Sequence, residues 1–80
     1  MIDYDRISHE TLAFLEYAKA ETPDITFVTL INPAERTVSV YAQKATTNIE
    51  RYSERYTFYE FLQSSFESIH KKLVQRFRRD

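Results

Sequence analysis

The sequence predicts an α+β domain in which two helices pack on one face of a short antiparallel sheet. Three observations support this class. Both ends of the chain repeat apolar residues at helical spacing, the segment between them alternates at strand spacing, and Pro23 and Pro33 interrupt the pattern. The expected order is α-β-β-β-α, in a single domain over residues 1–80.

The first helix is predicted over about residues 3–20, with Asp3 or Asp5 as its N-cap. Its inner face is expected to consist of Tyr4, Ile7, Thr11, Phe14, Leu15 and Ala18. Pro23 ends the helix because the residue before a proline is pushed out of the α region. The helix is therefore amphipathic and needs a surface to pack on.

The next two segments predict a β-hairpin. Residues 25–31 are rich in β-branched and aromatic side chains and are apolar on both alternating sets, which indicates burial on both faces. Residues 32–36 form a loop with Pro33 in the turn, and residues 37–43 alternate apolar and polar side chains. The first strand therefore needs a cover on each side.

Residues 47–56 admit two interpretations, a third strand or an N-terminal extension of the last helix. Helical phase favours the strand. Extending the last helix backward at about 100° per residue would put Arg51 and Arg55 in its core stripe. We therefore predict a third strand over about residues 49–55.

The last helix is predicted over about residues 58–78, because Thr57 and Glu60 fit a capping box at its start. Its core stripe, about 100° wide, is expected to contain Phe58, Tyr59, Leu62, Phe66, Ile69, Leu73 and Phe77. Phe61 and Val74 fall outside this stripe, one beyond each edge. They are therefore candidate contacts with a partner.

Composition argues against several classes of function. The chain has no cysteine, so it has no disulfide, thiolate zinc site or cysteine nucleophile, and no glycine for a phosphate-binding loop. His9 and His70 lack metal-ligand spacing and are expected on the surface. We expect a chain without catalysis, cofactor or metal.

Two further properties bear on where the protein works. No apolar run reaches the roughly 20 residues that span a membrane, and the acidic start does not resemble a signal peptide. With no cysteine, these features predict a soluble cytoplasmic protein. A chain of 80 residues builds one small core, which favours oligomerisation as a source of stability.

The predicted function is a small non-catalytic protein-binding module, such as a regulator, inhibitor or assembly factor. Two helices cover one side of the sheet, so the other side would expose an apolar patch. The candidate protein interface consists of Val28, Leu30, Tyr41, Tyr52, Tyr56, Phe61 and Val74. The partner is another protein or a second copy in a homodimer, and no membrane partner is expected.

The basic C-terminus supports an alternative, nucleic-acid binding. The candidate phosphate contacts are Lys71, Lys72, Arg76, Arg78 and Arg79. Against this interpretation, residues 1–24 are acidic and the whole chain carries a net charge of −1. Bases near a helix C-terminus are also typical of favourable interaction with the helix dipole.

Overall fold

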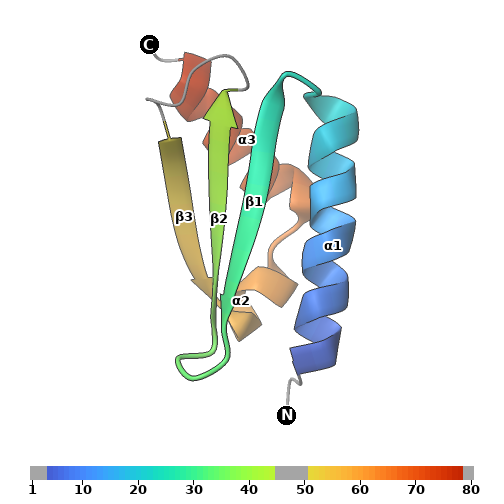
Figure 1. Ribbon diagram of the computed structural model, residues 1–80, viewed down its shortest axis with the longest axis vertical. Coiled ribbons are helices and arrows are strands. Elements are labelled where there is room, and N and C mark those ends of the chain that lie inside the picture. The colour runs from blue at the N-terminus through green and yellow to red at the C-terminus, as the bar shows by residue number, and fades with distance from the viewer. Residues whose placement is uncertain (1–3, 45–50, 79–80) are drawn as a thin grey trace.

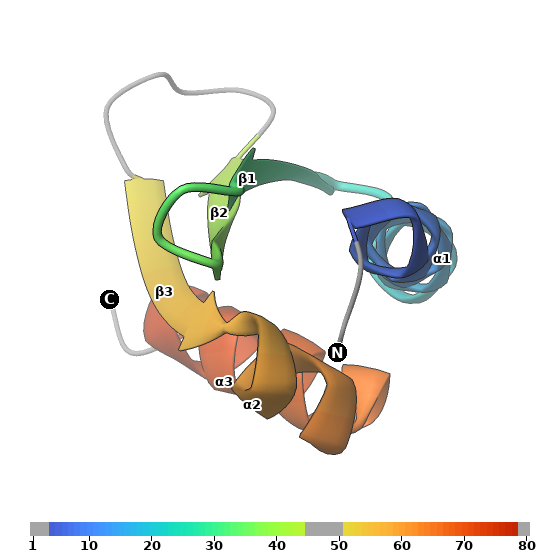
Figure 2. The same cartoon turned by 90° about the horizontal axis from the view of Figure 1, so that it is seen from below.

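A computed structural model describes residues 4–44 and 51–78, without the side chains of residues 44, 51, 77 and 78 (Figure 1). Its elements are α1 (Tyr4–Glu21), β1 (Ile25–Asn32), β2 (Thr37–Lys44), β3 (Arg51–Thr57), α2 (Phe58–Gln63) and α3 (Phe66–Arg78). The strands form one antiparallel sheet in the order β1-β2-β3. α2 and α3 lie behind this sheet, and α1 runs beside β1 (Figures 1 and 2).

The predicted α+β class and α-β-β-β-α order are confirmed. The strand interpretation of residues 47–56 is confirmed from Arg51 onward, while the predicted positions 49 and 50 lie outside the described residues. The helix alternative fails because Val38, Val40 and Ala42 of β2 pair with this segment.

The hairpin between β1 and β2 closes without glycine. Asn32 pairs with Thr37, and the Oδ1 atom of Asn32 accepts a hydrogen bond from the Glu35 N–H at 3.1 Å. Arg36 then adopts a φ of 55°, a left-handed conformation that costs a residue with a Cβ about 1 kcal/mol. A chain without glycine places an arginine where glycine usually serves.

The single helix predicted over residues 58–78 is two helices. Ser64 leaves the helical conformation, with φ −83° and ψ 141°. The Oγ atom of Ser65 accepts a hydrogen bond from the Ser68 N–H at 3.1 Å and so caps the start of α3. Because the chain leaves the helix at this point, one helical phase does not extend from α2 into α3.

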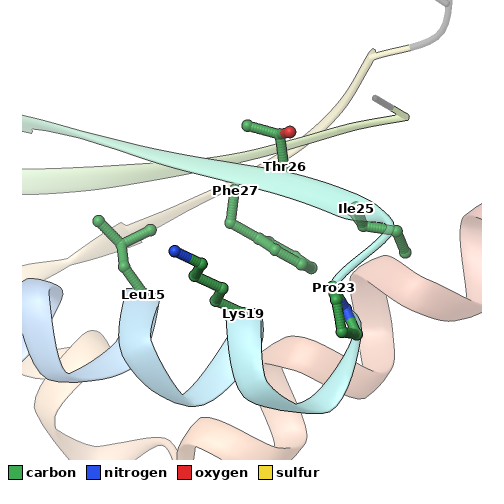
Figure 3. Close-up of a pocket in the computed structure, with 6 residues that line it drawn as sticks. All are labelled: Leu15, Lys19, Pro23, Ile25, Thr26 and Phe27. Carbon is green, nitrogen blue, oxygen red and sulfur yellow. The ribbon is translucent and has the colours of Figure 1, made fainter. Parts of the chain in front are cut away.

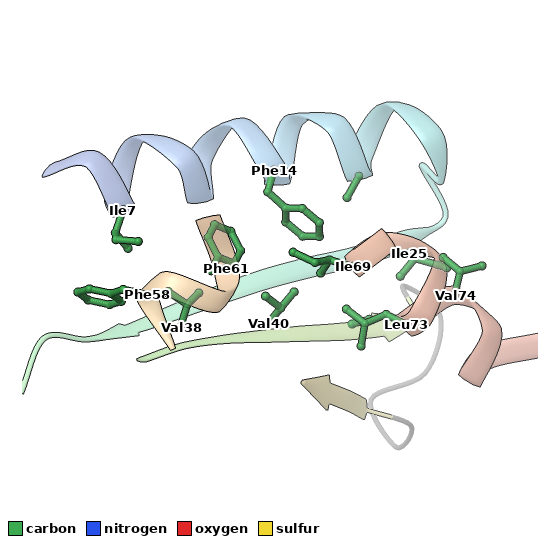
Figure 4. Close-up of a cluster of buried hydrophobic side chains, with 12 residues drawn as sticks. Ile7, Phe14, Ile25, Val38, Val40, Phe58, Phe61, Ile69, Leu73 and Val74 are labelled. Carbon is green, nitrogen blue, oxygen red and sulfur yellow. The ribbon is translucent and has the colours of Figure 1, made fainter. Parts of the chain in front are cut away.

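The core lies between the inner face of the sheet and the helices (Figure 4). Phe61 is 1% exposed and Val74 is 7% exposed, so their prediction as partner contacts is wrong for the folded chain. The Phe61 ring lies against Phe14 of α1 and Tyr56 of β3, at centroid distances of 6.3 and 6.4 Å. These residues are buried for two reasons. The helix breaks between α2 and α3, and α1 packs against these helices beyond the single apolar stripe predicted from the sequence.

The capping box predicted at the start of α2 is present. The Oγ1 atom of Thr57 accepts from the Glu60 N–H at 3.0 Å, and the Oε1 atom of Glu60 accepts from the Thr57 N–H at 2.9 Å. The hydrogen bond from the Thr57 backbone, followed by the one from its side chain, lowers the pKa of Glu60. The folded state therefore favours the ionised carboxylate.

Thr57→Ala is expected to lower the free energy of unfolding by about 1 kcal/mol, because it removes the acceptor for an N–H at the first turn. Urea denaturation at neutral pH measures this loss, and an unchanged midpoint would contradict it.

Glu60 contributes to the free energy of unfolding through its ionised carboxylate. This contribution is fully present above the unfolded pKa of Glu60 and is lost as the pH falls through its lower folded pKa. Glu60→Gln is expected to flatten this acid limb of the stability profile.

Candidate protein-binding interface

We call the sheet surface turned away from the helices the open face. Strand alternation and register place on it Thr26, Val28, Leu30, Ser39, Tyr41, Gln43, Ser53 and Arg55. Val28 is 53% exposed and Leu30 is 59% exposed. With Tyr41 and two polar neighbours they line a shallow hollow of ≈ 310 Å³. The expected outward placement of this apolar patch is thus observed, and its role in binding stays a prediction.

Two tyrosines of the predicted interface lie on the other side of the sheet. Tyr52 and Tyr56 are half-buried and pack against the core, because register pairs them with the inward-facing Ala42 and Val38. Burial, followed by the charge of Glu54, raises the pKa of Tyr56. Grouping these tyrosines with Val28 and Leu30 in one interface was therefore wrong.

The ladder between β2 and β3 shows which backbone groups reach the outer edge of β3. Phe58 N–H donates to the Arg36 carbonyl at 2.9 Å, so Thr57 occupies a non-hydrogen-bonded pair with Thr37. Alternation in an antiparallel ladder then turns the N–H and C=O groups of Thr57, Arg55 and Ser53 away from β2. These are the groups that an added strand would need.

Side chains of α2 and α3 occupy two of these outward groups. Thr57 N–H donates to Glu60, as described above, and the Ser53 carbonyl accepts from Nη1 of Arg76 at 3.1 Å. Arg76 is fixed in place by Glu54, whose Oε1 lies 2.7 Å from Nη2. The outer edge of β3 is therefore partly closed to another strand.

The outer edge of β1 lies beside α1. Leu15 and Lys19 extend from α1 toward β1, next to Phe27 (Figure 3). With Pro23 and Ile25 they line a hollow of ≈ 290 Å³ between helix and strand. A strand approaching β1 from this side would meet α1 first, so the open face is the accessible surface of this sheet.

The bases predicted to contact nucleic acid lie among acids. Lys71 and Lys72 are exposed, but Lys71 shares a hollow with Glu21 and Glu67, and Lys72 shares one with Glu54. Arg76 pairs with that same Glu54. The side chain of Arg78 and all of Arg79 lie outside the description. The described part of α3 therefore presents mixed charge, and nucleic-acid contact stays a prediction.

His70 is buried, which corrects the expectation of a surface position. Its Nε2 atom lies 2.9 Å from Oγ1 of Thr22, which itself donates to the Ala18 carbonyl at 3.1 Å. The two side chains therefore share a hydrogen bond between α3 and the end of α1. The ring also packs against Tyr17 and Phe27, so His70 joins α3 to the end of α1.

Spacing within α3 contained a signal for this burial. His70 stands four residues after Phe66 and four before Val74, and residues at that spacing share a helix face.

The described residues contain no group of three or more His, Cys, Asp or Glu side chains placed to hold a metal ion. None of the described helices has the length and apolar character needed to cross a membrane.

Fold and surface together define a small α+β domain with one uncovered sheet face. Comparison of the chain with protein-family models, curated proteins and solved structures found no match. The side chains of the open face are therefore the basis for inferring function.

Proposed function

We propose that this chain is a small cytoplasmic protein-binding module without catalysis, acting as a regulator, inhibitor or assembly factor. One observation supports this proposal above the others. Val28 and Leu30 are more than half exposed, side by side in a hollow of the sheet. Neighbouring apolar side chains rimmed by polar ones are typical of protein interaction sites.

The energy available at this patch suits a modest, specific interaction. Full burial of an exposed valine or leucine contributes about 1.5–3 kcal/mol, so two half-exposed side chains together offer about 2–3 kcal/mol. Tyr41, which pairs with Val28, adds contact area and a hydroxyl that interfaces favour. Polar neighbours such as Thr26 and Gln43 supply the rim of the site.

A capture experiment tests the proposal. A display library of protein fragments from the source genome is selected on the immobilised chain, and each captured fragment is measured against two variants. Val28→Thr with Leu30→Thr makes these two positions of the open face polar and places a residue of high β propensity at each of them. Leu12→Gln is the matched control, since Leu12 is 61% exposed on α1.

Fragments specific for the open face are expected to bind the wild type and Leu12→Gln equally, and the double variant about tenfold more weakly, for a loss of about 1.4 kcal/mol. Both variants should unfold within about 0.5 kcal/mol of the wild type, as surface substitutions usually do. Captured fragments that bind all three proteins alike, or an absence of captured fragments, would contradict the proposal.

A further inference from the structure

The open face has an apolar side and a cationic side. Val28 and Leu30 lie on β1, and Tyr41 lies next to them on β2. Arg55 lies on β3, is exposed, and is the charged side chain that the description places on this face. Among the described side chains, no carboxylate shares the face, because alternation turns Glu54 to the inner side of β3.

A second copy of the chain matches this pattern poorly. If two open faces stack about a two-fold axis along the strands, β1 of one copy covers β3 of the other, and Arg55 meets apolar side chains. If the axis runs across the strands, β3 covers β3, and two cationic sides meet without an acid between them. Juxtaposed like charges disfavour such a complex.

The size of the face fits one helix. Three strands about 4.8 Å apart form a surface about 14 Å wide, and a helix with its side chains is about 10 Å across. β1 has 8 residues and spans about 26 Å, the length of a helix of roughly 17 residues. An added strand is disfavoured because Glu60 and Arg76 occupy two backbone groups of the β3 edge and α1 lies beside the β1 edge (Figure 1).

We infer that the partner presents an amphipathic helix of four to five turns with acidic residues along one flank. Its apolar stripe packs on Val28, Leu30 and Tyr41, and its acidic flank lies over Arg55. This inference rests on the proposed function, because it names the partner chemistry for the same surface. The complex would then have helices on both faces of the sheet.

Two designed peptides test the inference. Each is an 18-residue helix former with leucines at i, i+3, i+4 and i+7 spacing; one carries glutamates along a flank and the other carries lysines there. Fluorescence anisotropy measures their binding to the wild type and to Arg55→Glu. Lys72→Glu is the control, since Lys72 is exposed on α3, away from the open face.

The glutamate peptide is expected to bind the wild type about fivefold more tightly than the lysine peptide, because exposed ion pairs contribute up to about 1 kcal/mol. Arg55→Glu should reverse this preference, and Lys72→Glu should leave it unchanged. Added salt should reduce the difference, since the pair is exposed. Amide chemical shifts on peptide binding should change in β1, β2 and β3.

Equal affinity for both peptides, or an unchanged preference in Arg55→Glu, would overturn the inference. Self-association of the wild type that the double variant at Val28 and Leu30 abolishes, measured by sedimentation, would also overturn it by identifying a second copy as the occupant. In either case, captured fragments that depend on Val28 and Leu30 would leave the proposed function standing. Captured fragments that bind the wild type and the double variant at Val28 and Leu30 equally well would contradict the proposed function itself.

Discussion

Phe14→Ala is expected to lower the free energy of unfolding by about 3–5 kcal/mol. The Phe14 ring is fully buried, and it meets the rings of Phe27, Phe61 and Phe66 at centroid distances of 6.1, 6.3 and 5.6 Å. One side chain of α1 thus joins β1, α2 and α3. Small domains have about 5–15 kcal/mol of stability in total, so the variant should unfold at much lower urea.

Leu12→Ala, in the same helix, is the control for this measurement. Leu12 is exposed, and its replacement should change the free energy of unfolding by no more than about 0.5 kcal/mol. Urea denaturation followed by circular dichroism compares the two variants. A Phe14→Ala midpoint close to that of Leu12→Ala would contradict the placement of α1 against the sheet.

Phe61→Ala should have a similar effect, a loss of about 3–5 kcal/mol, and it separates two assignments of this residue. As a partner contact, Phe61 would tolerate the change in the isolated chain. Its burial against Phe14 and Tyr56 instead makes it part of the core. Chemical denaturation of the isolated protein decides between these assignments.

Tyr59→Ala is the matched control for Phe61→Ala, because Tyr59 is an exposed aromatic residue of the same short helix. The double variant Phe14→Ala with Phe61→Ala should lose less stability than the sum of the two single-variant losses, since the Phe14 and Phe61 rings are in contact. Strict additivity would mean that Phe14 and Phe61 do not share a packing site.

Local pattern was enough to predict most of the fold. The capping box at Thr57, the stop before Pro23 and the alternation of residues 37–43 are short-range signals, and the observed elements follow them. The break at Ser64 and Ser65 was missed because apolar residues continue at helical spacing on both sides of it. Serine lowers helix propensity by only a few tenths of a kcal/mol, so tertiary packing decides such a break.

The candidate site was predictable in part, for a related reason. A period of two places Val28 and Leu30 on one face whatever surrounds them, so their shared orientation follows from the strand alone. The inner position of Tyr52 and Tyr56 depends on their register against β2, which is set by residues distant in the sequence. Arg76 is a similar case, because its pairing with Glu54 requires α3 to lie over β3.

The obstruction of the sheet edges, partial at β3, has a consequence for how this protein associates at high concentration. Edge strands with unpaired backbone groups template the addition of further strands, and that growth has no fixed end point. Here Arg76 and Glu60 occupy groups along the β3 edge, and α1 flanks β1. If the open face binds one helix, as proposed, association at that face has a fixed stoichiometry and does not lead to polymerisation.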